Sequence, residues 1–292
     1  MRFPFLGGIL NRREFLFSSC TALFISGCKS KSSAPTLRIS MIPTTDPGKI
    51  VRQSQPLVDY LEKQTGAKII LTVPTSYAAV VEAITSNRVD IAYLGGFTYL
   101  QAAARANVQP LVQRVKDKNF HSLFITQTNS SIHSMADLKG KTFAFGDINS
   151  TSGHLMPSYY MRQEKVDPSV IEKAIFTGGH DATALAVAHK RVDAGAMDEL
   201  VYQTMMGTGA ITPAEVRVFY TTPPFFDYVW VARAGLDPVL AQKFSQALLH
   251  LNEDDPQDKV LLDLLNAHKY AIAHATDYEP LRQAAKDDGL LQ

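Results

Sequence analysis

Apolar runs of strand length alternate with segments of helical spacing along most of this chain. Residues 37–42 form an apolar run, and residues 77–87 place Val80 and Ile84 on one helical face. Further strand-like runs lie at 68–73, 89–94, 111–115, 121–127, 142–146, 173–177, 192–197, 216–220 and 228–232. Further helical patterns lie at 97–106, 153–163, 181–190, 238–251 and 258–268. Because strands that alternate with helices build layered folds, the pattern predicts an α/β protein with mostly parallel sheets.

The N-terminal segment has the pattern of a bacterial export signal. Arginines precede a short apolar stretch at 15–25, which has the length of a signal-peptide core. The residues Ile25-Ser26-Gly27-Cys28 then resemble a lipobox, which implies cleavage before Cys28 and diacylglycerol on its sulfur. We therefore expect a signal peptide over 1–27 and a lipidated tether over 28–35.

This segment also sets the expected location. Arg12 and Arg13, followed by Glu14-Phe15-Leu16, resemble a twin-arginine export signal, and the sequence leaves the export route open. We expect a lipoprotein of the bacterial cell envelope that is exposed to the periplasm and held to a membrane through Cys28.

Charge and cysteine content exclude several classes of function. The formal net charge of +1 gives no bias toward nucleic acid, so we expect no nucleic-acid partner. Cys20 lies in the segment to be removed and Cys28 would carry lipid, so no thiol remains for a disulfide, a nucleophile or a zinc site. No HExxH, G-x-S-x-G or P-loop pattern is present, and we expect no enzyme, no metal and no cofactor.

Two segments of the chain echo each other. Residues 79–93 and 182–196 both give a helical pattern, a turn with Arg-Val-Asp, and a strand of small residues. At the same offset Tyr77 corresponds to His180, each at a helix start, and Gly95 corresponds to Asp198, each just after a strand. Since ligands bind at the carboxyl ends of strands in open α/β sheets, the echo predicts two matching edges around one cleft.

The segment after residue 145 is the strongest candidate for a binding site. A strand ends there, Ser150, Thr151 and Ser152 follow, and a helix begins. One hydroxyl is enough to cap a helix, whereas several hydroxyls with free amide groups can hold an anion at the positive end of the helix dipole. The sequence alone leaves both interpretations open.

Four other residues are candidates for contacting a ligand, and each could instead have a purely structural role. His180 follows two glycines at a helix start, where it either donates to an anion or lies on the surface. Asp198 either caps a helix or accepts a hydrogen bond from a protonated ligand oxygen. Tyr77 and Tyr93 offer phenolic donors and would otherwise be packing residues.

Several blocks together resemble one family. Residues 75–83 with 89–95, residues 137–145, and residues 150–153 with 177–182 are similar to the periplasmic substrate-binding proteins of phosphonate and phosphite ABC transporters. The resemblance covers about 36–250. It implies a two-lobed type II periplasmic-binding-protein fold with two crossing hinge strands. Lobe one would comprise 36–126 and 228–292, and lobe two would comprise 127–227.

The resemblance also implies a site and partners. Tyr77 and Tyr93 would contact the ligand from lobe one, and lobe two would hold the phosphorus oxygens. The residues implied for lobe two are Ser150, Thr151, Ser152, His180 and Asp198. No clear pair of acidic groups is placed to hold an amine, which favours phosphite or methylphosphonate over 2-aminoethylphosphonate. We expect a monomer that delivers its ligand to an ABC permease in the inner membrane.

The sequence leaves other ligands and another role open. The same fold could bind a sulfonate, nitrate or a thiamine precursor, or report its ligand to a membrane sensor kinase. Residues 223–224 are both proline and predict a rigid crossing segment. Phe225, Phe226 and Trp230, which follow them, are expected to serve mainly in packing.

Overall fold

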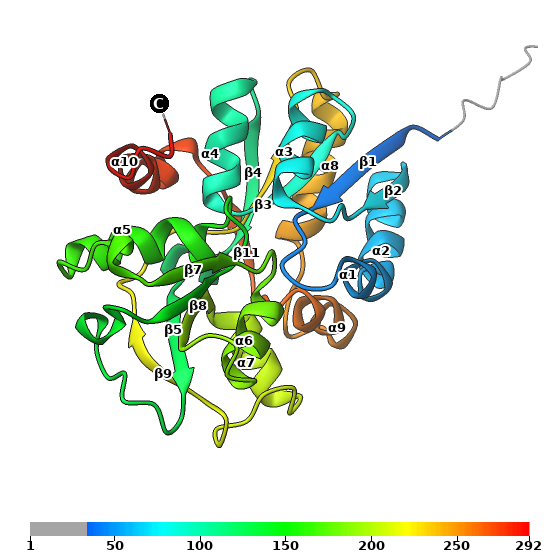
Figure 1. The fold of residues 1–292 in the computed structure, drawn as a ribbon. Helices are drawn as coiled ribbons and strands as arrows, with labels where there is room; N and C mark the ends of the chain where they lie inside the picture. Colours follow the sequence, from blue (N-terminus) through cyan, green and yellow to red (C-terminus); the bar gives the residue numbers. More distant parts are fainter. Residues whose placement is uncertain (1–33, 292) are drawn as a thin grey trace, which may run out of the picture. The chain divides into compact units, whose positions relative to one another are not determined.

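Two β-sheets organise residues 34–291, the part of the chain that this computed structural model describes (Figure 1). The first sheet is formed by β1 (Thr36–Met41), β2 (Lys68–Thr72), β3 (Ile91–Leu94), β4 (Gln109–Arg114), β10 (Val229–Ala232) and β11 (Tyr270–Ile272), in the order β11-β4-β10-β3-β1-β2. The second sheet is formed by β5 (Ser122–Gln127), β6 (Thr142–Phe145), β7 (Lys173–Phe176), β8 (Ala194–Asp198) and β9 (Val216–Thr221), in the order β7-β6-β8-β5-β9.

Helices accompany both sheets. Those from chain segments next to first-sheet strands are α1 (Pro47–Gln53), α2 (Gln55–Thr65), α3 (Tyr77–Thr85), α4 (Gly96–Arg105), α8 (Pro238–Leu249), α9 (Pro256–Leu264) and α10 (Glu279–Asp287). Those between second-sheet strands are α5 (Met156–Gln163), α6 (His180–Ala188) and α7 (Glu199–Gly207), with a π-helical turn, η3 (Thr151–Leu155), leading into α5. Short 3₁₀ turns are η1 (Val115–Asn119), η2 (Met135–Leu138), η4 (Pro168–Val170) and η5 (Ala275–Tyr278).

Each sheet buries apolar side chains on both faces. In β5, Leu123 and Ile125 belong to one buried cluster and Phe124 belongs to another. In β3, Ile91 and Ala92 likewise fall into different clusters. Because side chains alternate along a strand, this division requires cover on both sides of a sheet, and the predicted α/β fold class is confirmed.

The expectation of mostly parallel sheets is wrong. Strand β1 pairs in parallel with β2 and β3, and β6 with β7 and β8, but β10 runs antiparallel to β3 and β4. Strand β5 is also antiparallel to β8 and β9, and β11 to β4. An apolar run indicates that a strand is buried but not in which direction it runs. Strand direction depends on how distant segments pair in the tertiary structure.

Two segments cross between the sheets. The chain leaves β4 and enters β5 through 115–121, and it returns from β9 to β10 through 222–228. Phe120 and Phe225 exchange backbone hydrogen bonds of 2.9 and 3.0 Å, and the Asp227 N–H donates to the Asp117 carbonyl at 3.0 Å. This pairing confirms the two crossing strands, with the prolines at 223–224 inside one of them. The exact boundaries of the two lobes stay a prediction.

The internal echo is also present in three dimensions. Asn87 and Lys190, just before each Arg-Val-Asp, both have a left-handed backbone, with φ of 60° and 57°. Asp90 accepts from the Arg38 N–H at 2.9 Å, and Asp193 accepts from the Thr142 N–H at 2.8 Å. Each aspartate therefore ties its turn to the neighbouring strand in the same way.

Some expectations lie outside the described residues. The predicted signal peptide, and Cys28 with most of its tether, precede residue 34. Within residues 34–291, no helix has the length and apolar character needed to cross a bilayer.

Candidate functional site

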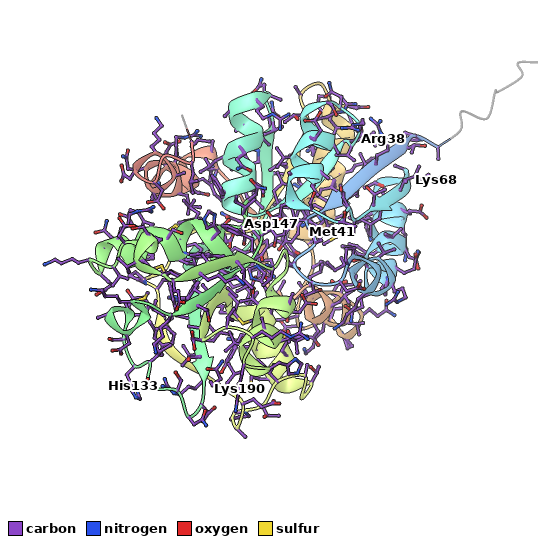
Figure 2. The ribbon with its side chains drawn as sticks, viewed as in Figure 1. Arg38, Met41, Lys68, His133, Asp147 and Lys190 are labelled. Carbon is purple, nitrogen blue, oxygen red and sulfur yellow. The ribbon has the colours of Figure 1, made fainter. Side chains whose placement is uncertain are left out.

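Four helical segments begin close to one another. They are α3 and α4, which accompany the first sheet, and η3 and α6, which accompany the second. Helix α3 begins at Tyr77, whose N–H donates to Asp147 Oδ2 at 3.4 Å; Figure 2 labels Asp147. The N–H of Phe97, near the start of α4, donates to Thr151 Oγ1 of η3 at 3.0 Å. Helix α6 begins at His180, whose N–H donates to the Thr44 carbonyl at 3.0 Å. Because a helix N-terminus carries a partial positive charge, the place where these starts meet favours an anion.

Buried polar atoms without partners gather at these helix starts. In residues 34–291 the buried side-chain atoms that lack a hydrogen-bond partner include Tyr77 Oη, Ser152 Oγ, His180 Nε2 and Asp227 Oδ2. We call these four residues the cradle. Each is no more than 2% exposed. A buried polar atom left unpaired costs about 1–3 kcal/mol, so four such atoms indicate a place for a polar ligand.

Glycines allow the close approach of the elements around the cradle. A Cβ at Gly153 would lie 2.9 Å from the His180 ring and 3.0 Å from Ser150 Oγ. A Cβ at Gly95 would lie 2.9 Å from Thr151 Oγ1 and 3.1 Å from Asp227 Oδ1. Such contacts are too short for a side chain, and they place Asp227 beside the hydroxyl cluster.

His180 is held as a neutral donor. The backbone N–H of Asp198 donates to His180 Nδ1 at 3.2 Å, which requires a lone pair on Nδ1 and places the ring proton on Nε2. Complete burial lowers the pKa of His180 and favours the same neutral form. The N–H at Nε2 has no partner among residues 34–291 and is free to donate to a ligand.

Asp227 is the acceptor of the cradle, and sequence analysis missed it. Its Oδ1 accepts from the Gly96 N–H at 3.0 Å, which leaves Oδ2 unpaired. Burial raises the pKa of Asp227 to about 7. The only sequence signal is a carboxylate between two prolines and an apolar strand, in a segment whose aromatic residues are predicted to serve mainly in packing. Phe225 and Trp230 of that segment are indeed buried.

Tyr77 supplies a third neutral donor, after Ser152 and His180. Burial raises the pKa of Tyr77 well above its ordinary value, and the nearby carboxylates of Asp147, Asp198 and Asp227 raise it further. Its hydroxyl therefore keeps its proton at any physiological pH.

The other predicted hydroxyls both support this arrangement. Ser150 Oγ accepts from the Gly153 N–H at 3.0 Å and caps η3, as the simple capping interpretation expects. Thr151 Oγ1 accepts from the Phe97 N–H. The structure therefore brings Tyr77 together with the predicted hydroxyl residues and His180.

The side chains of two predicted residues make other contacts. Tyr93 packs on Tyr228, with ring centroids 5.3 Å apart, and lines a separate cavity. The Asp198 carboxylate accepts from the N–H groups of Leu200 and Val201 at 2.6 and 2.9 Å, so it caps α7. The capping alternative for Asp198 is thus realised, and a direct ligand contact by Tyr93 or Asp198 stays a prediction.

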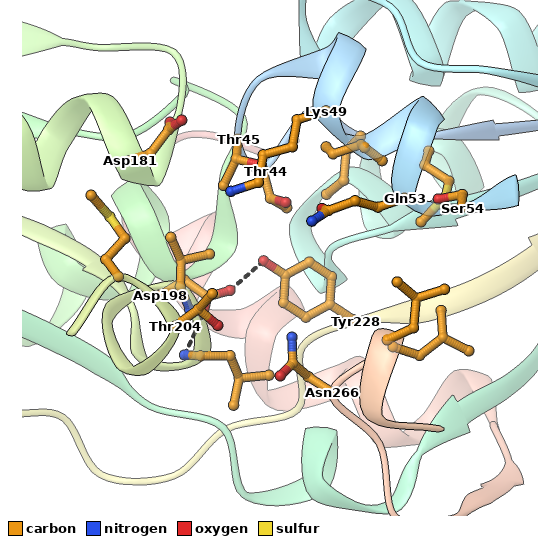
Figure 3. A pocket seen from close by; sticks show the side chains of 18 of the residues that line it. Thr44, Thr45, Lys49, Gln53, Ser54, Asp181, Asp198, Thr204, Tyr228 and Asn266 are labelled. Carbon is orange, nitrogen blue, oxygen red and sulfur yellow. Dashed lines mark hydrogen bonds between the residues drawn. The ribbon is translucent and has the colours of Figure 1, made fainter. Parts of the chain in front are cut away.

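The separate cavity has a volume of about 350 Å³ and is shown in Figure 3. Its polar lining includes Thr44, Lys49, Gln53, Arg114, Asp181 and Asn266. None of the four cradle residues is among the residues that line it. Arg114 forms a buried ion pair with Asp117 at 2.5 Å, so its charge is already balanced within the protein.

The cradle combines hydrogen-bond donors with one carboxylate acceptor. No group of His, Cys, Asp or Glu in residues 34–291 has the arrangement of a metal site. Three neutral donors and one carboxylate can solvate an anion that carries a single proton, with Asp227 accepting that proton's hydrogen bond.

Comparison with known proteins identifies relatives that cover most of the chain. The family model of the periplasmic substrate-binding protein of phosphonate ABC transporters matches residues 39–278. A probable ABC transporter phosphite binding protein of Prochlorococcus marinus is 28% identical over 291 residues, which cover 95% of this chain and 98% of that protein. A phosphate-import protein of Mycolicibacterium smegmatis is 32% identical over 250 residues, which cover 77% of this chain and 78% of the relative.

A solved structure has the same fold. The Prochlorococcus marinus protein in complex with methylphosphonate superposes with a TM-score of 0.83 at 27% sequence identity. The match covers 88% of this chain and 99% of that chain. The stretch that the family model matches contains the crossing segments and all strands of both sheets except the start of β1.

Proposed function

This chain belongs to the family of periplasmic substrate-binding proteins of phosphonate ABC transporters, and we propose that it captures phosphite or methylphosphonate in the cradle. The observation that carries the proposal is the set of unpaired buried atoms on Tyr77, Ser152, His180 and Asp227. A tetrahedral oxyanion with one protonated oxygen would satisfy all four. Homologous proteins of this family are transport receptors and not enzymes.

The composition of the cradle explains how it would select among anions. No lysine or arginine belongs to it, so recognition depends on matching donors and acceptors and not on net charge. Above its pKa of about 7 the buried Asp227 is ionised, and it then repels a fully deprotonated oxygen and accepts from a protonated one. Sulfate, which carries no proton near neutral pH, would leave Asp227 Oδ2 facing a bare oxygen. We therefore expect sulfate to bind poorly.

The hydrogen bonds that the cradle can form are sufficient for micromolar affinity. Micromolar affinity needs about −8 kcal/mol. Hydrogen bonds to a charged group contribute about 1.5–3 kcal/mol each, and the cradle offers four such contacts besides the helix dipoles. This sum leaves room for the cost of closing the two sheets around the ligand.

Hydrogen bonds already join the elements of the two sheets around the cradle. Gln101 of α4 donates to the Asn149 side chain at 3.0 Å, and the α3 and α4 starts donate to Asp147 and Thr151. We infer that this is the closed arrangement, that hinge motion at the crossing segments opens it, and that an ABC permease recognises the closed form.

The names of the relatives support the ligand class and identify its main competitor. One relative is named for phosphite and its structure contains methylphosphonate, while another is named for phosphate import. Phosphate is therefore the ligand against which selectivity has to be measured.

Titration calorimetry of residues 29–292 with phosphite, methylphosphonate, 2-aminoethylphosphonate, phosphate and sulfate tests the proposal. We expect micromolar or tighter binding of phosphite or methylphosphonate and much weaker binding of phosphate and sulfate. Failure of every phosphorus compound to bind a folded, ligand-free sample would remove the proposed substrate class and turn attention to sulfonates, nitrate or a thiamine precursor.

We also propose that Cys28 carries the lipid anchor. The support is the Ile25-Ser26-Gly27-Cys28 sequence, which follows a short apolar stretch. Cys28→Ser should move the protein from the membrane fraction to the soluble periplasmic fraction of a bacterial host. If the variant stays with the membranes, the anchor lies elsewhere.

A further inference from the structure

Asp198 and Tyr228 line the 350 Å³ cavity and also adjoin residues of the cradle. Both line the cavity, and they are joined by a hydrogen bond from Tyr228 Oη to Asp198 Oδ2 at 2.5 Å (Figure 3). On the other side, the Asp198 N–H contacts the His180 ring at 3.2 Å, and Tyr228 directly follows Asp227 in the chain. The pair therefore touches cradle residues at one end and open space at the other.

The pair is held firmly in place. Asp198 also accepts from two N–H groups at the start of α7, so both of its oxygens are engaged. The Tyr228 ring stacks on Tyr93 and meets Phe120 edge-on at 5.4 Å, with the Arg114 guanidinium 5.0 Å from its centroid. Tyr228 is 4% exposed and Asp198 is 2% exposed. A side chain packed on several faces in this way resists displacement.

The space beyond the pair is large enough for an organic group. A volume of about 350 Å³ lies within the range of small-molecule pockets, roughly 300–1,000 Å³. Its lining next to Asp198 is apolar as well as polar, with Leu200, Val201 and Met205 from α7. A substituent on phosphorus that reached this space would find contacts there, but it would have to pass the pair.

We propose that the Asp198–Tyr228 pair is a wall that limits the group on phosphorus to hydrogen or methyl. The proposal rests on the function proposed above and specifies its substrate class. A longer alkyl group would have to break the hydrogen bond and turn the Tyr228 ring into the cavity. An aminoalkyl group meets the same obstacle, and it also finds no free oxygen on Asp198 for its ammonium because helix α7 and Tyr228 occupy both.

A series of phosphonates with methyl, ethyl, propyl and 2-aminoethyl groups tests the wall on the wild-type chain. Trp230 is the only tryptophan, and its ring centroid lies 4.8 Å from that of Tyr93. Its fluorescence can therefore report binding alongside calorimetry. We expect propylphosphonate to bind at least tenfold more weakly than methylphosphonate, since a pocket that discriminates by one methylene does so by roughly 10–200-fold. Equal affinities across the series would overturn the proposal.

Two variants locate the effect. Tyr228→Leu removes the ring and should raise the ratio of propylphosphonate to methylphosphonate affinity at least tenfold. Tyr228→Phe keeps the packing and removes only the hydrogen bond, and it should raise the ratio at least threefold. Tyr60→Leu makes the same change at a distant tyrosine, whose hydroxyl donates to the Ala247 carbonyl, and should leave the ratio unchanged.

The outcomes separate the two proposals. Tight methylphosphonate binding with an unchanged ratio in both Tyr228 variants would reject the wall and keep the proposed function. Absence of binding by every phosphorus ligand to the wild-type chain would reject both proposals together.

Discussion

Ser150 and Ser152 lie two positions apart, but only the Ser150 hydroxyl has a hydrogen-bond partner within residues 34–291. Ser150 Oγ accepts from the Gly153 N–H and caps η3, whereas Ser152 Oγ is buried without a partner among the described residues. A side chain that satisfies its own helix stabilises the fold, and one that waits for a ligand costs stability until the ligand arrives. Substitution of the two serines should therefore separate stability from binding.

Ser152→Ala should weaken phosphite or methylphosphonate binding at least tenfold, because a hydrogen bond to a charged ligand contributes about 1.5–3 kcal/mol. The free energy of unfolding of the ligand-free variant should stay equal or rise, since no hydrogen bond within the protein is lost. Ser150→Ala should instead lower the free energy of unfolding by about 1 kcal/mol. Calorimetric titration and urea unfolding measure both effects. Wild-type affinity in Ser152→Ala would remove Ser152 from the cradle.

Asp227 predicts a dependence of stability on pH. Its pKa is raised from 3.8 to about 7 in the folded chain, so between these values the native state holds a proton that the unfolded chain has lost. The free energy of unfolding of the ligand-free protein then falls as the pH rises through this window, by roughly 1.4 kcal/mol for each pH unit. Above pH 7 this contribution stays constant.

Asp227→Asn should remove this contribution while keeping an acceptor for the Gly96 N–H. Compared with the variant, the wild-type chain should lose roughly 3 kcal/mol more stability between pH 5 and pH 8. Urea unfolding of ligand-free samples at both pH values measures the difference. Parallel curves for the two proteins would show that Asp227 does not keep its proton in the folded state.

Single residues were predictable where the signal is local. Three hydroxyls at a helix start and a histidine after two glycines are visible in the sequence, and the structure places Gly153, which follows Ser152, against the His180 ring. Asp227 was not predictable, because its role arises only where a crossing segment brings it beside Gly95 and Thr151. Asp198 carried a helix-start signal that suits a cap and a ligand contact equally well.

At the scale of elements, the approach of α4 to η3 depends on Gly95. Its φ is −76°, which any residue can adopt, so alanine at this position would not strain the backbone. The added Cβ would lie 2.9 Å from Thr151 Oγ1, which belongs to the opposite side of the cradle. The substitution should therefore affect the meeting of the two sides and leave each side intact.

Gly95→Ala should weaken ligand binding about tenfold or more, because the contact between α4 and η3 has to loosen. The unfolding temperature of the ligand-free protein should change little, because hinge opening separates α4 from η3 and relieves the contact. Gly207→Ala is the matched control, since a Cβ there meets no atom within 4 Å, and it should leave affinity unchanged. Equal affinities of the two variants would contradict the inferred closed arrangement.

Most elements were predictable to within a few residues, because buried faces impose their period on the sequence. Strand β11 spans only Tyr270–Ile272, too short to show a period, and α10 was also missed. Strand direction was mispredicted because β4, β5 and β10 owe theirs to the crossing segments. Pairing of distant segments is a tertiary property that local patterns do not carry.

At the scale of the whole molecule, contacts between the two sides extend beyond the cradle. Arg162 of α5 forms an ion pair with Asp288, which caps the end of α10. The crossing segments pair through Phe120 and Phe225. The family resemblance of separate sequence blocks predicted this architecture better than periodicity did, because it carried the order in which the chain visits the two sheets.

A crystal structure of residues 29–292 with methylphosphonate would show directly whether the cradle holds the ligand. We expect phosphonate oxygens within hydrogen-bonding distance of Tyr77 Oη, Ser152 Oγ, His180 Nε2 and Asp227 Oδ2, with the methyl group facing Tyr228. A phosphonate group bound in the 350 Å³ cavity, with the four cradle atoms still unpaired, would contradict it.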